Sequence, residues 1–382
     1  MNLTIGYSEY SSPFSIDSFR NEFGLKNRRS VSTHLKRTAI STMLKTAELA
    51  DGLLGTTLQW DDVEEIANEC AKGVELKFGD KKSIKPLAEG VGLQSLLGIA
   101  DFIKFLPPCH NSEIYFYNYI RTLSTSISIL PDYYFGKEIE LESDGNYTKG
   151  CIAIELVENV KTLSPLENFS DSQMLQVLDS LAKLQTQFLD MNEEERRKAP
   201  HRGLAGLYST FKDWFLQLNN GLMAQFPDPE MQKLTETFAR KLPEIMTADD
   251  LDLLPAQLEM QRMIHFGLAA TDLARVFNTC LTPEARHANT DRYLEKYYKF
   301  LETRCKEAGK EVPFDLEQLT TTYQLAYPRV SAYLLPALTA VLEKVVSMPD
   351  SPIKLAFLGS FIAKVKGIYA DIIEYHENRP EF

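Results

Sequence analysis

The chain has 382 residues, of which 44% are hydrophobic and 25% are charged. This composition is typical of a globular protein and excludes a disordered, collagen-like or coiled-coil chain. The formal net charge of −12 disfavours a nucleic-acid-binding protein, because affinity for nucleic acids depends on Lys and Arg side chains that neutralise phosphates. ATP is not excluded, since one nucleotide needs only a local pocket rich in basic or amide groups.

The five cysteines are scattered and form no Cys-x-x-Cys pair, so we expect reduced intracellular thiols rather than a zinc site or a redox dithiol. The N-terminus shows no apolar segment of the kind found in signal peptides. The most apolar stretch, residues 333–346, contains Pro336 and is too short to span a bilayer. These features predict a cytoplasmic protein with neither a membrane segment nor a nucleic-acid partner.

In chain order, residues 1–35 are polar and rich in serine, and they predict a flexible leader. Residues 36–158 predict a small mixed domain with helices at 35–50, 57–73 and 111–123, strands at 74–79 and 151–154, and a hairpin within 131–145. Residues 159–382 predict a helical domain, because apolar side chains recur with helical spacing over 170–190, 204–220, 229–246, 290–308, 314–347 and 352–376.

Several stretches of the sequence indicate more specifically what kind of protein these two parts form. They are GLLGTTLQWDDVEEIANE (52–69), FGDKKSIKPLAEGVGLQS (78–95), HNSEIYFYNYI (110–120), KGCIAIELVENVKTL (149–163), MIHFGLAATDLARVF (263–277) and YLEKYYKFL (293–301). Their order resembles the CHK kinase-like family, the nematode and insect branch of small-molecule kinases. That branch includes the ecdysteroid kinase-like proteins and is related to choline and aminoglycoside phosphotransferases.

The resemblance covers residues 45–376 and implies an α+β, protein-kinase-like fold with two lobes. The small β-containing N-lobe would be residues 36–158, and the helical C-lobe would be residues 159–382. The implied activity is transfer of a phosphoryl group from ATP, with Mg²⁺, to a hydroxyl of a small lipophilic or amino-alcohol molecule.

The resemblance implies a phosphate-binding loop at Gly90, Gly92 and Ser95, where glycines let backbone N–H groups approach phosphate oxygens. It also implies that Glu113 is the helix glutamate that holds the phosphate-binding lysine. Lys104 is the only lysine between this loop and Glu113. It lies nine residues before Glu113, which leaves little room for the family's intervening strand, turn and helix start.

The adenine-binding hinge is implied at Glu155, Leu156 and Val157, directly after the apolar strand at 151–154. Adenine binds there through backbone groups, so the identities of the side chains matter little. Asp272, within ATDLARVF, matches the family's internal acidic position. The resemblance implies that this residue braces the catalytic region and does not take part in the reaction.

The two catalytic motifs of the family have no match. None of the six histidines is followed two positions later by Asp, as the pattern H-G-D-L-W-x-x-N requires. The metal-holding Asp of the pattern I-D-x-Q should precede MIHFG, but residues 259–262 read EMQR and Met260 stands at the acidic position. Methionine is unsuited to Mg²⁺, which requires hard oxygen ligands. The sequence therefore predicts neither a catalytic residue nor a metal ligand.

Three functions stay open on the sequence. The first is a degenerate kinase-like protein that has lost whole segments through altered splicing, exon loss or an error in the predicted gene. The second is an active small-molecule kinase that uses Asp249, Asp250 or Asp252 in place of the lost carboxylates. The third is a helical interaction protein without a ligand. We favour the first, because a base Asp and a metal-binding Asp act as a unit whose loss removes most of the activity.

Overall fold

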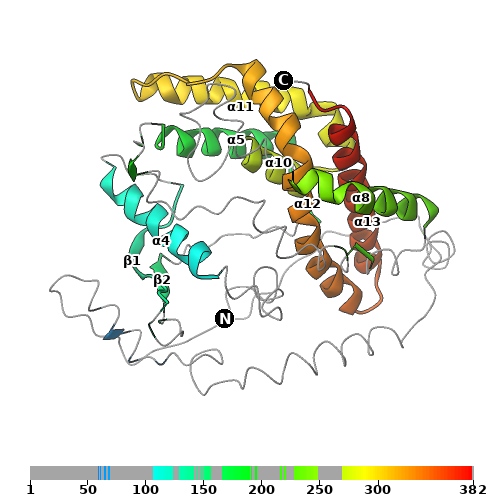
Figure 1. The fold of residues 1–382 in the computed structure, drawn as a ribbon, viewed down its shortest axis with the longest axis horizontal. Helices are drawn as coiled ribbons and strands as arrows, with labels where there is room; N and C mark the ends of the chain where they lie inside the picture. Colours follow the sequence, from blue (N-terminus) through cyan, green and yellow to red (C-terminus); the bar gives the residue numbers. More distant parts are fainter. Residues whose placement is uncertain are drawn as a thin grey trace.

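The computed structural model describes residues 106–123, 129–141, 150–155, 166–189, 228–247 and 269–380. It also describes residues 59, 61, 64–65, 68, 143, 148, 191, 194–195, 216 and 219–220. Within this part of the chain the architecture is mostly helical with one small antiparallel sheet, in agreement with the expected α+β class. The sheet lies at one end of the molecule, and the long C-terminal helices lie at the other (Figure 1).

The sheet pairs two short strands. Strand β1 (Tyr133–Lys137) runs antiparallel to β2 (Cys151–Ile154), with Lys137 opposite Cys151. Strand β2 has the predicted bounds. The hairpin predicted within residues 131–145 was wrong in its extent, because the strand that pairs with β1 is β2, which lies beyond that range. Alternation of polar and apolar residues predicts a strand but does not identify its partner.

Helix α4 (Leu106–Thr122) packs against β1 and confirms the helix predicted at 111–123. Its first turns are tied to the sheet by two side chains. His110 Nε2 lies 2.9 Å from the carbonyl oxygen of Lys137. The Asn111 side chain both donates to the carbonyl of Ile139 and accepts from its N–H, each at 2.9 Å. These contacts fix the position of α4 relative to the strand.

The remaining described helices form one connected group. They are α5 (Asp171–Thr186), α8 (Pro229–Thr247), α10 (Ala269–Cys280), α11 (Pro283–Glu307), α12 (Leu316–Ser347) and α13 (Pro352–Glu377). Four predicted helices therefore agree with the structure to within a few residues. Of the helix predicted at 204–220, only residues 216, 219 and 220 are described, and all three are helical.

Local capping signals set the helix starts. Ser170 and Gln173 form a capping box at the start of α5. Thr282 caps α11, and Pro283 occupies its first turn, where a missing N–H costs nothing. Helix α11 therefore begins seven residues before the predicted range 290–308. The prediction missed this start because the first two turns of α11 are polar and show no apolar stripe.

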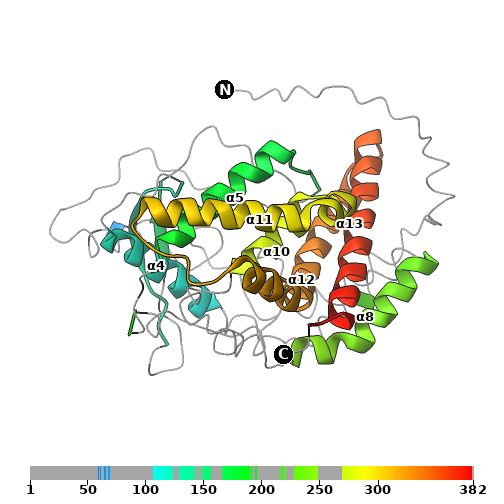
Figure 2. The ribbon, with the colours of Figure 1, turned by 90° about the horizontal axis from the view of Figure 1, so that it is seen from above.

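Helix α10, which has six buried residues among its twelve, packs mainly against α12 and also touches α11. Helices α5 and α11 lie side by side, while α12 packs against both α10 and α13 (Figures 1 and 2). Helix α8 covers the outer side of α13 (Figure 2). No helix in the described part of the chain is long and apolar enough to cross a bilayer.

A buried ion pair lies at the centre of this group. Asp371 of α13 is 3% exposed, and its Oδ2 accepts a hydrogen bond from Arg286 Nε of α11 at 2.7 Å. The other oxygen lies 2.6 Å from His287 Nε2. The Tyr327 hydroxyl of α12 lies 3.1 Å from Asp371 Oδ2 and 2.7 Å from Asn278 Oδ1 of α10. One carboxylate thus connects three helices directly and a fourth through Tyr327.

A second buried cation lies nearby. Lys364 of α13 is 2% exposed, and its ammonium donates to the carbonyl oxygen of Thr279 at 2.6 Å, at the C-terminal end of α10. Burial lowers the pKa of Lys364 to about 8, although the neighbouring Cys280 acts in the opposite direction. The proton is therefore held less tightly in the folded chain than in the unfolded chain.

We expect the Asp371→Asn substitution to lower the free energy of unfolding by about 3–5 kcal/mol, because it leaves Arg286 buried without an opposite charge. Urea unfolding followed by circular dichroism measures the change. The exposed Asp291 on α11 provides a control, and Asp291→Asn should change stability by less than about 0.5 kcal/mol. The double variant Arg286→Met/Asp371→Asn should regain part of the loss. An Asp371→Asn variant as stable as the parent contradicts this assignment.

The Lys364→Met substitution should remove a pH-dependent penalty. Below pH 8 the lysine is charged in both states, and folding must desolvate the charge. Between pH 8 and 10.5 the unfolded chain binds more protons than the folded chain, so the penalty declines as pH rises. The stability of the variant relative to the parent should therefore fall by roughly 1–3 kcal/mol across this range. Chemical denaturation at several pH values tests this, with exposed Lys344→Met as the control. A flat difference contradicts it.

Candidate functional site

The structure describes three of the site residues predicted from sequence, namely Glu113, Glu155 and Asp272. The other predicted site residues, Gly90, Gly92, Ser95, Lys104, Leu156 and Val157, lie outside the described residues. So do Asp249, Asp250, Asp252 and Met260. The three described residues come from separate elements: α4, the end of β2 and the start of α10.

Glu113 lies on the exposed face of α4. The buried side of α4 is fixed by the neighbouring Ile114 and by Tyr117 one turn later, which are 1% and 7% exposed. A Cβ atom at Gly136 of β1 would come within 2.9 Å of Ile114 Cγ1, so the close approach of α4 to the strand depends on this glycine. Burial raises the pKa of Tyr117, and the negative charge of Glu113 adds to the effect. Glu113 is thus held at the surface on a firmly seated helix.

Glu155 follows β2 directly and is tied to Asp132. Its backbone N–H donates to the carbonyl oxygen of Asp132 at 2.7 Å. Its carboxylate accepts from the N–H of Asp132 at 3.2 Å. Both groups of Glu155 are therefore used in closing the strand pair. If this segment binds adenine, the N–H that donates to it must come from Leu156 or Val157.

Asp272 lies in the first turn of α10 and is braced by two other helices. Its Oδ2 accepts from Gln185 Nε2 of α5 at 3.2 Å. Gln185 Oε1 in turn accepts from the hydroxyl of Tyr297 on α11. Desolvation by surrounding protein atoms raises the pKa of Asp272, although the residue as a whole is exposed, while Arg275 and Gln185 act in the opposite direction. Burial, and then the charge of Asp272, raise the pKa of Tyr297.

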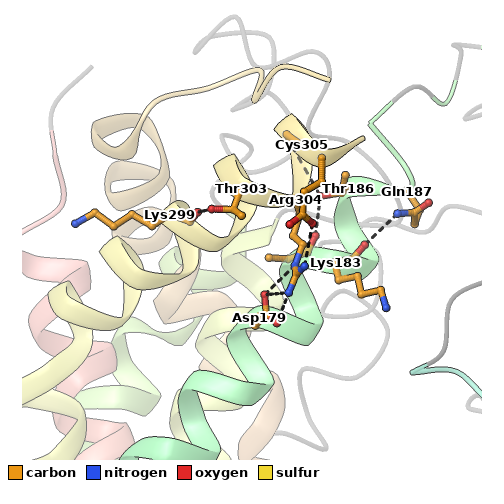
Figure 3. A network of polar contacts seen from close by, with 10 residues as sticks. Asp179, Lys183, Thr186, Gln187, Lys299, Thr303, Arg304 and Cys305 are labelled. Carbon is orange, nitrogen blue, oxygen red and sulfur yellow. Dashed lines mark hydrogen bonds and ion pairs between the residues drawn. The ribbon is translucent and has the colours of Figure 1, made fainter. Parts of the chain in front are cut away.

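Ionic and polar contacts hold the end of α5 that carries Gln185. Arg304 of α11 forms a two-pronged contact with Asp179 of α5, with distances of 2.9 Å from Nε and 2.6 Å from Nη2 (Figure 3). Lys310 donates to the carbonyl oxygen of Thr186 at 2.9 Å. The Thr186 hydroxyl lies 3.8 Å from Cys305 Sγ. The C-terminal end of α5 is therefore fixed against α11 close to Gln185.

The same end of α5 also contacts α4. Phe188, in the turn after α5, stacks with Phe116 at a centroid distance of 5.5 Å and with Tyr119 at 5.4 Å. The helix that carries Glu113 and the helix that carries Asp272 therefore both dock on one end of α5. Sequence reasoning missed Gln185 and Phe188, because neither position shows a local signal of its tertiary contacts.

The described carboxylates do not fit a magnesium centre. Mg²⁺ takes several hard oxygen ligands in a near-octahedral arrangement. Asp272 is partly desolvated and engaged by Gln185, and Glu113 lies on a different helix. Among the residues that the structure describes, no group of three or more His, Cys, Asp or Glu side chains is placed to hold a metal ion. No chemical step through Mg²⁺ follows from these residues.

The chain matches the model of a protein family over most of its length. A family model described as "Uncharacterized oxidoreductase dhs-27" (DUF1679) matches the chain in three segments, residues 46–102, 97–263 and 261–380. Neighbouring segments overlap at 97–102 and at 261–263, so no residue of the chain between the first and last matched positions is left unmatched. No curated protein and no solved structure matches the chain. Because the match extends over well more than half of its length, the chain belongs to the family described as uncharacterized oxidoreductase dhs-27.

Proposed function

We propose that the chain is a kinase-like protein of the small-molecule phosphotransferase type that has lost the residues for phosphoryl transfer and acts in the cytoplasm without catalysis. The proposal rests on the resemblance to CHK kinase-like proteins and on the lack of the H-G-D and I-D-x-Q motifs. The observation that carries it is that two separately matched segments of the family meet at residues 261–263.

The pattern of this match supports the loss of whole segments. Residues inserted into the chain would leave unmatched positions between the segments, but the segments overlap instead. Overlapping segments are the pattern expected if positions of the family have no counterpart in this chain. The overlap at 261–263 begins directly after Met260, where a metal-holding acid is expected, and ends on the first residue of the MIHFG string. The break at 97–102 falls just before Lys104, where the family's strand is expected.

The retained groups favour binding without chemistry. Phosphoryl transfer depends on metal ions that neutralise the phosphates and on a carboxylate that orients the acceptor hydroxyl. In the proposed protein neither the metal-holding acid nor the orienting carboxylate stands at its family position. A bound nucleotide would therefore not transfer its phosphoryl group. The backbone near Leu156 and Val157, Glu113 of α4 and the braced Asp272 are parts that could still serve a nucleotide or small-molecule pocket.

We do not extend the word oxidoreductase in the family description to this chain. A dinucleotide-binding domain carries the pattern G-x-G-x-x-G, in which the third glycine allows close packing of helix and strand. The only Gly-x-Gly of the sequence is Gly90 and Gly92, and Ser95 stands at the third position. No described feature favours a nicotinamide or flavin cofactor.

Thermal unfolding with millimolar ATP, with and without Mg²⁺, tests the proposal. A ligand that binds only the folded state must raise its stability, so a rise in Tm that needs Mg²⁺ would report a nucleotide held through the metal. We expect no such rise and no formation of ADP. A rise that needs Mg²⁺, together with ADP release, contradicts the proposal and supports an active kinase. The variant Asp249→Asn/Asp250→Asn/Asp252→Asn should then abolish the activity. The absence of any shift with ATP would favour the helical interaction protein.

If whole segments were lost by altered splicing, exon loss or an error in the predicted gene, the positions of the losses should coincide with exon boundaries. We expect exon boundaries at the codons for residues 97–102 and 261–263, where the matched segments meet. Sequencing of genomic DNA and full-length cDNA checks this. A longer transcript with a His-x-Asp string before MIHFG would identify the enzyme form of the same gene. Two junctions that both lie inside uninterrupted exons contradict the explanation.

A further inference from the structure

Helix α4 is held on one face by the sheet. Successive residues of an α-helix lie about 100° apart around its axis, so side chains three, four or seven positions apart share a face. His110, Ile114 and Tyr117 follow this spacing, and each of them contacts β1. The ring of Tyr117, for example, stacks on that of Tyr133 with 5.0 Å between the centroids. This face of α4 is therefore bound to the sheet.

The opposite face of α4 is aromatic and is held by the helical part of the chain. Phe116 and Tyr119 both stack on Phe188, with centroid distances of 5.5 and 5.4 Å and angles of 22° and 24° between the ring planes. The hydroxyl of Tyr115 donates to the carbonyl oxygen of Glu195. Phe188 and Glu195 both follow α5 in the chain, so α4 lies between the sheet and the end of α5 (Figure 1).

Phe188 gives α4 a firm support. The residue is 4% exposed, so its ring is buried. Its backbone N–H donates to the carbonyl oxygen of Gln185 at 3.0 Å, and its own carbonyl oxygen accepts from the N–H of Met191 at 3.1 Å. Gln185 is also the residue that donates to Asp272. One turn of the chain therefore supports both the carboxylate of Asp272 and the helix that carries Glu113.

These contacts oppose movement of the sheet relative to the helical part of the chain. Two parts of a chain that share a small interface usually move relative to each other, unless the interface is large and apolar. Here the contact is made of stacked rings, which have a preferred geometry and add energy beyond the area that they bury. Because the other face of α4 is bound to β1, rotation of the sheet must break either the stack on Phe188 or the contacts with β1.

We propose that α4 locks the sheet and the helical part of the chain into one relative orientation, with Phe188 as the locking side chain. The lock is complete without a ligand, because all of its contacts join residues of the chain itself. It goes beyond the proposed function and does not depend on it, since an active kinase would be locked by the same contacts. Its test does not involve ATP.

Hydrogen exchange of the backbone amides, measured by mass spectrometry on the full chain, tests the lock. In the Phe188→Ala variant we expect the amides of α4 to exchange about tenfold faster or more, because both ring stacks are lost. Exchange in α13 should stay close to that of the parent, which separates local release from general destabilisation. Small-angle X-ray scattering should show a wider distribution of interatomic distances. Tyr115→Phe removes a single hydroxyl and should accelerate exchange in α4 roughly two- to tenfold.

The Phe238→Ala variant is the matched control. Phe238 is 1% exposed and packs on Tyr369, and α8 lies across the molecule from α4 (Figure 1). This variant should accelerate exchange in α8 and α13 and leave α4 unchanged. If Phe188→Ala does not fold, Phe188→Leu keeps a buried apolar side chain without the ring and tests the same stack. Unchanged exchange of α4 in a folded Phe188 variant, or equal acceleration of α4 and α13, overturns the proposal.

Discussion

Asp371 lies where α11, α12 and α13 come together, and its buried carboxylate is the charge around which the helical part of the chain is organised. Arg286 and Tyr327 contact one of its oxygens, and His287 contacts the other. Burial of a carboxylate is costly unless it is paired and hydrogen-bonded. Any arrangement of these helices that separates Asp371 from Arg286 must therefore leave two charges without compensation in an apolar core.

Aromatic side chains surround this pair and exclude water from it. The ring of Tyr327 packs against Tyr375 at a centroid distance of 4.6 Å and against Tyr323 at 5.6 Å. Burial raises the pKa of Tyr375 to about 12, with Asp371 as the next cause. In such surroundings the ion pair gives a directional contact to a core whose remaining contacts are mostly apolar. The combination ties α10 to one arrangement of its neighbours.

The C-terminal end of α5 has a comparable role for the candidate site. The C-terminal half of α5 and the turn after it contact α10 through Gln185, α11 through Asp179 and α4 through Phe188. A scaffold of this kind does not need a catalytic loop to keep its shape, because its contacts lie within and between helices. This explains how a chain without the expected catalytic carboxylates can retain a well-packed helical core.

Much of the secondary structure follows from local signals in the sequence. The bounds of β2 and the approximate ranges of α4, α5, α8, α12 and α13 follow from apolar spacing. Ser170 illustrates the reason, since a helix start satisfies its own N–H groups through a side chain a few residues away. The resemblance drew attention to Glu113, Glu155 and Asp272, and the structure describes all three, with Asp272 in the first turn of α10.

Tertiary structure alone decided which polar residues became internal. By helical spacing, Arg286, Lys364 and Asp371 are indistinguishable from surface charges, yet all three are buried. The sequence by itself determined most of the described helices and the absence of the patterns H-G-D and I-D-x-Q. The partner of β1, the brace on Asp272 and the buried ion pair required the folded chain. The physical reason is that capping and periodicity act over a few residues, whereas Arg286 and Asp371 are 85 positions apart and meet only when the helices pack.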